Sequence, residues 1–418
     1  MAGEGQKTTV CLKIREECIH IMSTICLKNG ALSDGRLWNV KSDILVDSEE
    51  NRIIDIGPEL SGDENIDLAG YTVLPGLFDA HVHIVTGHIK YNDTALKNWA
   101  QAGVLTVRDL GLGDGTRACD GYLAWRETVR TPQCAEILTA GQAIAAVGGY
   151  MHRMGPDENG IGVTTPEEAR SAIVKQLTDG CDGVKTAMDI DMMDENTPQL
   201  SPETVRAIAD AAKEMNVWCC AHVLRSRFLR VLVDNGIPEM AHMVTDPIPE
   251  DLLDEMAVKN VAVTCTLQTI NAPRPELSPK EMEEMAEKMK NAPPRKMEPI
   301  DTVQQERDAI ENARRFHEKG GMLVMGTDTM RMEQTPEVAR VPIKEFQLLH
   351  QAGLSVQEVL ATATCNAAKV CKVDDRLGSI EVGKQANLIA IRSPLDETFE
   401  ALSHVEFVMN RGVVIRNR

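Results

Sequence analysis

The chain has 418 residues, of which 43% are hydrophobic and 26% are charged, as is typical of a soluble globular protein with one large domain and a smaller one. Its formal net charge of −19 argues against a nucleic-acid partner or an anionic membrane surface. No apolar stretch approaches the roughly 18 residues that would span a membrane, and the first residues lack the core of a signal peptide. We expect a cytoplasmic protein that acts on a small molecule, has no membrane partner and forms a homo-oligomer.

The 11 cysteines are an odd number and are scattered, and several of them stand in apolar, strand-like runs (Cys219, Cys220 and Cys265). This pattern favours reduced thiols over a disulfide framework. An alternative is that Cys219–Cys220 or the N-terminal Cys11 and Cys18 bind a metal. No Cys-x-x-Cys pair supports that alternative, so we interpret them as core or surface thiols.

In chain order, the first predicted unit covers residues 22–71, where short alternating segments are separated by turn signals typical of hairpins. Residues 371–418 have the same texture. The two ends of the chain are therefore predicted to form one composite β-sandwich domain, with a larger body of residues 72–370 inserted between them.

Apolar, strand-like runs alternate with helical patterns throughout 72–370, which predicts a parallel sheet wound by helices. One predicted helix, SPETVRAIADAAKEMN, begins with Ser201 as its N-cap, followed by Pro202. The long charged segment 271–320 is predicted to be an excursion between the last two strands. Eight strands in a chain of this size favour a closed (β/α)₈ TIM barrel. The eight runs are VLPGLFDAHVHI, VLTVRDL, AEILTAG, GVKTAM, VWCCAHV, PEMAHMV, VAVTCTL and MLVMGTDT.

In such barrels the reactive residues lie at the carboxyl ends of the strands. Five of the predicted strands end in polar side chains. Four of them end in residue types that bind metals, and the fifth ends in a lysine. These groups are His81, His83, Lys185, His222, His242 and Asp328.

His81 and His83 are two residues apart, so on a strand both side chains point the same way. Imidazole nitrogen is a good zinc ligand. His222 and His242 each end an apolar run, about twenty residues apart, which favours a pair of ligands for a second metal. Asp328 follows Gly326, where the backbone can approach closely, and a carboxylate there would bind one metal and hold a water.

Lys185 is the unusual member, because burying an ammonium group costs several kcal/mol. It could be paired with Asp182 or Asp189. The histidines and the aspartate directed at the same volume favour another interpretation, in which burial makes the amine neutral. A neutral amine adds CO₂ to form a carbamate (N6-carboxylysine), whose two oxygens can bridge two divalent ions, most simply Zn²⁺.

These motifs resemble those of the amidohydrolase superfamily over residues 22–418. The string PGLFDAHVH, the DGVK of the fourth strand and LGSIEVGKQANLIAI carry the resemblance to the branch with imidazolonepropionase-like proteins, Xaa-Pro dipeptidases and ochratoxin-hydrolysing amidases. The resemblance implies that His81, His83 and Asp328 hold one metal, that His222 and His242 hold the other, and that carboxylated Lys185 bridges them. Imidazolonepropionase itself fits less well, because that mononuclear enzyme lacks the bridging lysine.

Two departures from the family pattern concern the substrate. Dinuclear relatives have Gly-Gly-His before the fourth strand, whereas this chain has GGYMHR, so His152 is displaced by two residues and is either a carbonyl-polarising group or a loop histidine. In the family's prolidases a tyrosine follows the fifth-strand histidine, and here Leu224 stands in that place. Arg225, Arg227 and Arg153 are alternative ligands for a substrate carboxylate, although the first two could equally be helix-surface charges.

The predicted activity is hydrolysis of an amide bond in a small, peptide-like or N-acyl amino acid substrate with a free carboxylate. A metal-bridging hydroxide would attack, with Asp328 accepting its proton and returning it to the leaving amine. One alternative is hydrolysis of a lactone, a phosphoester or a cyclic amidine (deamination) on the same scaffold. Another is a non-catalytic binding protein, but all six ligand positions are filled.

Overall fold

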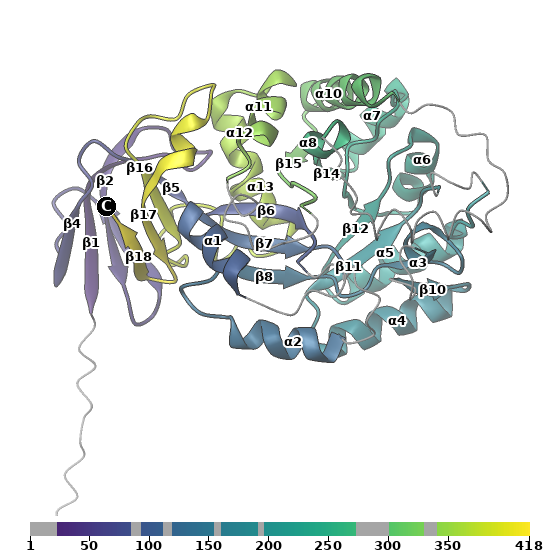
Figure 1. Ribbon diagram of the computed structural model, residues 1–418, viewed down its shortest axis with the longest axis horizontal. Coiled ribbons are helices and arrows are strands. Elements are labelled where there is room, and N and C mark those ends of the chain that lie inside the picture. Colours follow the sequence, from purple (N-terminus) through teal and green to yellow (C-terminus); the bar gives the residue numbers. More distant parts are fainter. Residues whose placement is uncertain are drawn as a thin grey trace, which may run out of the picture.

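The computed structural model describes residues 23–84, 93–111, 119–153, 160–190, 196–272, 301–329 and 341–418. Cys11, Cys18 and most of the excursion predicted at 271–320, residues 273–300, lie outside the described residues. Figure 1 shows a β-rich unit at one end of the molecule and a larger body of strands wrapped by helices at the other. Among the described helices, none combines the length and the apolar character that crossing a membrane requires.

Both ends of the chain contribute strands to one eight-stranded mixed sheet, in the order β18-β17-β16-β5-β1-β2-β3, with β4 paired along β1. Antiparallel pairing of β5 with β16 joins the N-terminal strands to the C-terminal ones. The predicted shared unit is therefore present, whereas its description as a sandwich of two sheets stays a prediction. The strands are β1 (Thr24–Leu32), β2 (Val40–Asp47), β3 (Arg52–Gly57), β4 (Glu64–Asp67), β5 (Thr72–Pro75), β16 (Leu388–Ile391), β17 (Val405–Asn410) and β18 (Val413–Asn417).

A separate apolar core stabilises this terminal sheet. Leu27, Ile44, Val73, Leu388 and Phe407 come from five different strands and are all buried in one cluster. These side chains come from both ends of the chain, so the core of the terminal unit needs both ends to be complete.

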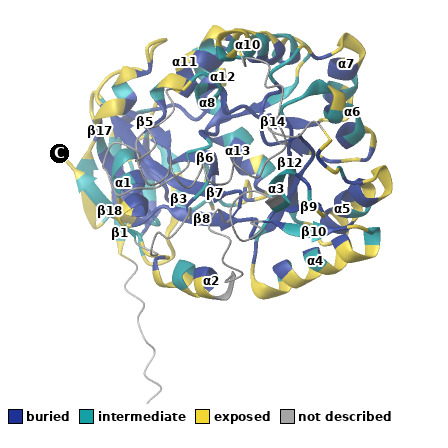
Figure 2. Ribbon diagram, turned by 45° about the vertical axis from the view of Figure 1, so that its right-hand side comes forward, coloured by how far each residue is buried: buried dark blue, intermediate teal, exposed yellow. Residues whose placement is uncertain are grey.

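Each of the eight strand-like runs of the body contains a parallel strand, which gives the chain a TIM-barrel-like α/β fold. The strands are buried and the helices cover them from outside (Figure 2). The barrel strands are β6 (Leu77–Val82), β7 (Val104–Asp109), β8 (Glu136–Thr139), β11 (Gly183–Ala187), β12 (Trp218–His222), β13 (Glu239–Met240), β14 (Ala262–Thr264) and β15 (Met322–Val324).

Strand pairing is not continuous around the barrel, so the expected full closure requires correction. The strands fall into one sheet of β6-β7-β8 and another of β10-β9-β11-β12-β13-β14-β15. Between β15 and β6 the regular pairing is interrupted, and contact continues through single hydrogen bonds, such as that from the backbone N–H of Ala80 to the carbonyl of Met325 over 3.1 Å, and through an isolated bridge of Val82 with Thr329. Between β8 and β11, the backbone N–H of Asp182 donates to the carbonyl of Thr139 over 2.8 Å. The added strands β9 (Ile144–Ala146) and β10 (Ile161–Val163) were not predicted.

The helices lie on the outside of the barrel, and the one N-cap that was predicted can be compared with the structure. The Ser201 side chain accepts a hydrogen bond from the backbone N–H of Thr204, which confirms it as the N-cap of α5. The described helices are α1 (Thr94–Ala102), α2 (Cys119–Thr128), α3 (Tyr150–Arg153), α4 (Pro166–Asp179), α5 (Pro202–Glu214), α6 (Ser226–Asp234), α7 (Glu250–Val258), α8 (Leu267–Ile270), α10 (Thr302–Glu318), α11 (Ile343–Gln351), α12 (Val356–Thr362), α13 (Cys365–Val370) and the 3₁₀ helix η1 (Glu400–His404).

Candidate metal centre

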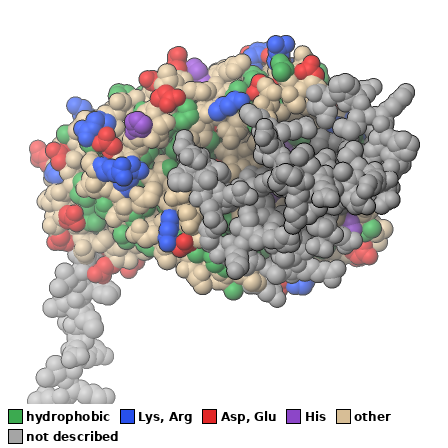
Figure 3. Space-filling model, viewed as in Figure 1, with side chains coloured by type: hydrophobic (Ala, Val, Ile, Leu, Met, Phe, Trp, Pro, Cys, Tyr) green, Lys and Arg blue, Asp and Glu red, His purple; other side chains and the backbone are tan. Residues whose placement is uncertain are grey.

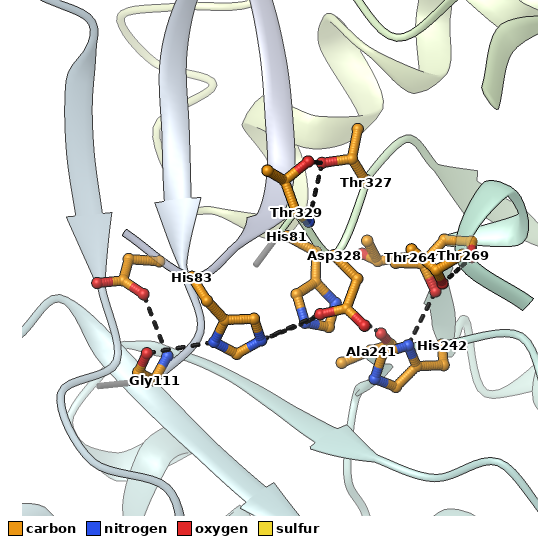
Figure 4. Close-up of polar contacts among 12 residues, drawn as sticks. His81, His83, Gly111, Ala241, His242, Thr264, Thr269, Thr327, Asp328 and Thr329 are labelled. Carbon is orange, nitrogen blue, oxygen red and sulfur yellow. Dashed lines mark hydrogen bonds and ion pairs between the residues drawn. The ribbon is translucent and has the colours of Figure 1, made fainter. Parts of the chain in front are cut away.

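His81 and His83 lie at the carboxyl end of β6, where their imidazole nitrogens face each other (Figure 4). The Nδ1 of His81 is 2.8 Å from the carbonyl oxygen of Ala241, and the Nδ1 of His83 is 3.2 Å from that of Gly111. A carbonyl only accepts, so each Nδ1 carries the proton and each Nε2 keeps its lone pair. The two Nε2 atoms are 3.3 Å apart.

Asp328 completes this group from the turn that follows β15. Its Oδ1 lies 3.2 Å from the Nε2 of His81 and 3.1 Å from the Nε2 of His83. Burial opposes its ionisation, but His81, His83 and His242 outweigh that effect and hold the pKa of Asp328 well below its usual value. The backbone of Asp328 has φ 50°, a left-handed conformation that is uncommon outside glycine. Such a strained residue at the site is consistent with a functional constraint.

His242 and His222 extend the group along the neighbouring strand ends. The Nδ1 of His242 is 2.8 Å from the hydroxyl of Thr266, which can accept its proton. The His242 ring centroid lies 4.7 Å from that of His81 and 4.6 Å from that of His222. Burial, with further contributions from neighbouring cations, lowers the pKa of both His222 and His242 well below the usual value, which favours neutral imidazoles.

This group of side chains suits a cation, because the atoms that meet there carry lone pairs that can coordinate a metal ion. Ligand atoms of His81, His242 and Asp328 lie within 4.8 Å of one another. Two imidazole lone pairs and a carboxylate oxygen at about 3 Å repel one another unless a proton or a metal ion lies between them. Burial opposes a charge on His83, but its contact with Asp328 dominates and raises its pKa.

Lys185 brings a buried amine to the same region. Its side chain is 1% exposed, and neither its Nζ nor the Nε2 of His222 has a hydrogen-bond partner among the described residues. Desolvation is the main cause of the lowered pKa of Lys185, and the charge of Arg108 acts in the same direction. The pairing of Lys185 with Asp182 or Asp189 is not formed: Asp182 contacts Arg126, and Asp189 contacts Arg225. A neutral amine in this position is the form that reacts with CO₂.

The three arginines that were predicted to bind a substrate carboxylate differ in their surroundings. The Arg225 guanidinium donates to Asp189, a buried carboxylate whose Oδ2 lies 3.7 Å from the Nε2 of His222. Arg227 is exposed, and its guanidinium lies over the ring of Phe228. The side chain of Arg153 lies outside the described part of the chain.

His152 accepts a hydrogen bond at Nδ1 from the backbone N–H of Gly148 over 3.2 Å, and its ring lies against Gly162. The residue that the sequence analysis missed is Tyr150, on the same short helix α3. Its ring stacks on that of His222, with centroids 4.7 Å apart and planes 23° apart. The signal was available, because Tyr150 directly follows Gly148–Gly149, the third position of the family's Gly-Gly-His motif. Tyr150 therefore directly borders His222, one of the candidate metal ligands, and a role for His152 stays a prediction.

A barrel-like α/β fold with clustered histidines and an aspartate at its strand ends defines a class of metal-dependent hydrolases. The Amidohydrolase family pattern matches residues 72–416, and the chain belongs to this family. The predicted resemblance to the amidohydrolases is thereby confirmed.

The chain is 28% identical over 208 residues to a 5-methylthioadenosine/S-adenosylhomocysteine deaminase of Halobacterium salinarum, which covers 46% of this chain and 47% of that protein. It thus spans about half the length of such curated relatives. Over 376 residues it is 20% identical to the imidazolonepropionase of Picrophilus torridus, covering 86% and 88% of the two chains.

Two solved structures share the fold. A Xaa-Pro dipeptidase with methionine bound in its active site superimposes with a TM-score of 0.74 at 24% identity, covering 94% of this chain and all of the other. The ochratoxinase of A. niger superimposes with a TM-score of 0.73 at 17% identity, covering 95% and 96%. At these identities the likeness concerns the fold alone.

Proposed function

We propose that this protein is a metal-dependent hydrolase that cleaves the amide bond of a small, carboxylate-bearing substrate. Membership of the amidohydrolase family supports hydrolysis of a C–N bond in general. The observation that carries the finer proposal is the convergence of acceptor atoms from His81, His83 and Asp328, close to the unpartnered buried amine of Lys185. A lysine ammonium would be repelled by any bound cation, whereas a carbamate on that nitrogen would bind it.

In this proposal His81, His83 and Asp328 hold one divalent ion, His222 and His242 hold a second, and the carbamate of Lys185 bridges them. Hydrogen bonds from Nδ1 fix the orientation of three of the four imidazoles, to Ala241, Gly111 and Thr266. Such fixed ligands favour binding because little conformational freedom is lost. Divalent ions in this set, most simply zinc, would acidify a water molecule and polarise the substrate carbonyl.

Asp328 is the proton carrier of the reaction. Its carboxylate accepts the proton that the attacking water releases as the water oxygen bonds to the carbonyl carbon. When the C–N bond breaks, the same carboxylate passes that proton to the leaving nitrogen, so the products are an acid and an amine. Because the neighbouring histidines keep Asp328 ionised, it is ready to accept at neutral pH.

The substrate side of the site is proposed to be bounded by Tyr150 and Arg225. The Tyr150 ring covers His222, and Arg225 pairs with Asp189 beside the same histidine. A phenol hydroxyl is a donor for an oxyanion or a carboxylate, and a guanidinium attracts an anionic substrate. A second candidate is deamination of a cyclic amidine, which the partial similarity to a deaminase favours.

The experiment is to assay the zinc-loaded protein against matched substrates. One panel holds N-acyl amino acids and dipeptides, each with its carboxyl-amidated counterpart, and the other holds an adenosine derivative, a lactone and a phosphoester. We expect turnover in the first panel only, with the free carboxylates preferred. Turnover confined to the second panel would contradict the amide-hydrolase proposal.

A further inference from the structure

A cavity of about 250 Å³ lies at the opposite ends of the barrel strands from the candidate metal centre. By the volume that water occupies in the liquid, it would hold roughly eight molecules. Its walls come from the end of α2, the starts of β8 and β12, and the segment after α13. It is charged, with the cationic side chains Arg126, Arg130, Lys372 and Arg376 in its lining.

Three arginines converge on a single buried carboxylate in this wall. Arg376 donates from Nη1 and Nη2 to the two oxygens of Glu136, over 2.9 and 2.8 Å. Arg130 and Arg411 approach the same carboxylate only to 3.8 and 3.9 Å. Glu136 has 6% of its side chain exposed, so these guanidiniums gather around a group that can neutralise just one of them.

The other acidic groups reduce this excess only in part, among them Asp375, whose charge acts on Arg376. Asp182 forms an ion pair with Arg126, in which the Nη1 of Arg126 lies 2.6 Å from the Oδ2 of Asp182. Glu127 is exposed and lies 3.5 Å from Arg130, a distance at which an exposed pair gains little. The Lys372 Nζ donates to the neutral amide oxygen of Asn216 over 3.1 Å.

This local excess of positive charge stands in a chain of net charge −19. On the face shown in Figure 3, by contrast, the described acidic and basic side chains are interspersed. Burial, followed by repulsion from Arg130 and Arg376, lowers the pKa of Arg411 despite the attraction of Glu136. Holding three guanidiniums together costs free energy that a bound anion would offset.

We propose that this basal cavity binds the dianionic phosphate group of a small ligand, either free phosphate or a phosphate monoester. Guanidinium groups match phosphate oxygens in a bidentate manner, and a lysine ammonium adds a point charge. Arg130 and Lys372 are the residues with donors to spare, because Arg376 is committed to Glu136. This site is independent of the proposed hydrolytic function, since it shares no residue with the metal centre.

The test is isothermal titration calorimetry of the metal-loaded protein with inorganic phosphate and, separately, methyl phosphate, at constant ionic strength. We expect saturable binding that Arg130→Gln and Lys372→Gln each weaken at least tenfold. Arg130 has 54% of its side chain exposed, so its replacement should not unfold the chain. Arg314→Gln is the matched control, because Arg314 pairs with Glu311 and Glu318 on the surface of α10.

If both cavity variants weaken binding, the probe that binds the wild type more tightly identifies the occupant as the ester or the free ion. Phosphate bound at the metal centre would be retained in Arg130→Gln, so identical isotherms for wild type and both cavity variants would overturn the proposal. Equal weakening in Arg314→Gln would also overturn it, because it would reduce the effect to net charge. Absence of saturable binding to the wild type would overturn the proposal as well.

Discussion

The carboxylate of Asp79 accepts two hydrogen bonds from Thr327, one from its backbone N–H over 3.0 Å and one from its hydroxyl over 2.6 Å. It also accepts one from the backbone N–H of His81 over 3.3 Å. One buried carboxylate on β6 thus connects the strand that carries His81 to the turn that carries Asp328. Asp79 and Thr327 are 248 residues apart in the sequence, so their contact also helps to join the ends of the barrel.

Thr327→Val should weaken metal binding and activity, since it keeps the shape of the side chain but removes the hydroxyl that donates to Asp79. Loss of such a supporting hydrogen bond costs about 10- to 100-fold in metal affinity or activity. Zinc affinity by competition with a chelator and kcat/KM should fall together. Thr327→Ser is the control and should stay near wild type; a valine variant with unaltered affinity would show that the contact does not position Asp328.

Lys185→Met should separate stability from activity. The free energy of unfolding of the metal-free variant is expected to be about 1–3 kcal/mol higher than that of the metal-free wild type, because an unpartnered buried amine is replaced by an apolar side chain. The same variant should lose bound metal and turnover. Lys185→Ala leaves room for a short carboxylic acid, and added acetate with bicarbonate is expected to restore part of the activity; full activity in Lys185→Met would instead make the lysine structural.

Tyr150→Phe keeps the ring that stacks on His222 and removes only the hydroxyl. If that hydroxyl contacts the substrate, kcat/KM should fall by about 10- to 100-fold, or roughly 1.4–2.7 kcal/mol, with zinc content unchanged. Steady-state kinetics together with elemental analysis of the same preparation provide the two readouts. Unchanged kinetics in Tyr150→Phe would restrict the tyrosine to packing against His222.

Arg225→Ala and Arg227→Ala form a matched pair on neighbouring positions. Arg225→Ala leaves the buried Asp189 without its cation and should lower the free energy of unfolding by about 1–3 kcal/mol. Arg227 is exposed, and its replacement should change stability by about 0.5 kcal/mol or less. Chemical denaturation measures both effects.

If Arg225 also attracts the substrate carboxylate, its replacement should lower kcat/KM for that substrate by about 30- to 150-fold, or roughly 2–3 kcal/mol. The carboxyl-amidated substrate should be nearly indifferent to the change. Equal losses for the two substrates would assign Arg225 to structure alone.

The sequence predicted the strand positions well, because each barrel strand lies within a short apolar run, with His222 at the end of β12 and Asp328 in the turn after β15. It did not predict how completely the ladder closes, since strand pairing such as that missing between β8 and β11 joins segments that are remote in sequence. The contact of Asp79 was not predicted, because its partner Thr327 is remote in sequence. The contact of Tyr150 was not predicted, because stacking of its ring on α3 against His222 on β12 joins residues that are remote in sequence.

The metal content of the active protein tests the central claim most directly. Protein produced with zinc and bicarbonate should contain close to two zinc ions per chain by elemental analysis, since four imidazoles, a carboxylate and a carbamate form two ligand sets. Removing the metal with a chelator should abolish turnover, and two equivalents of zinc should restore it. Fully active protein with one ion per chain, or with none, would contradict the dinuclear account.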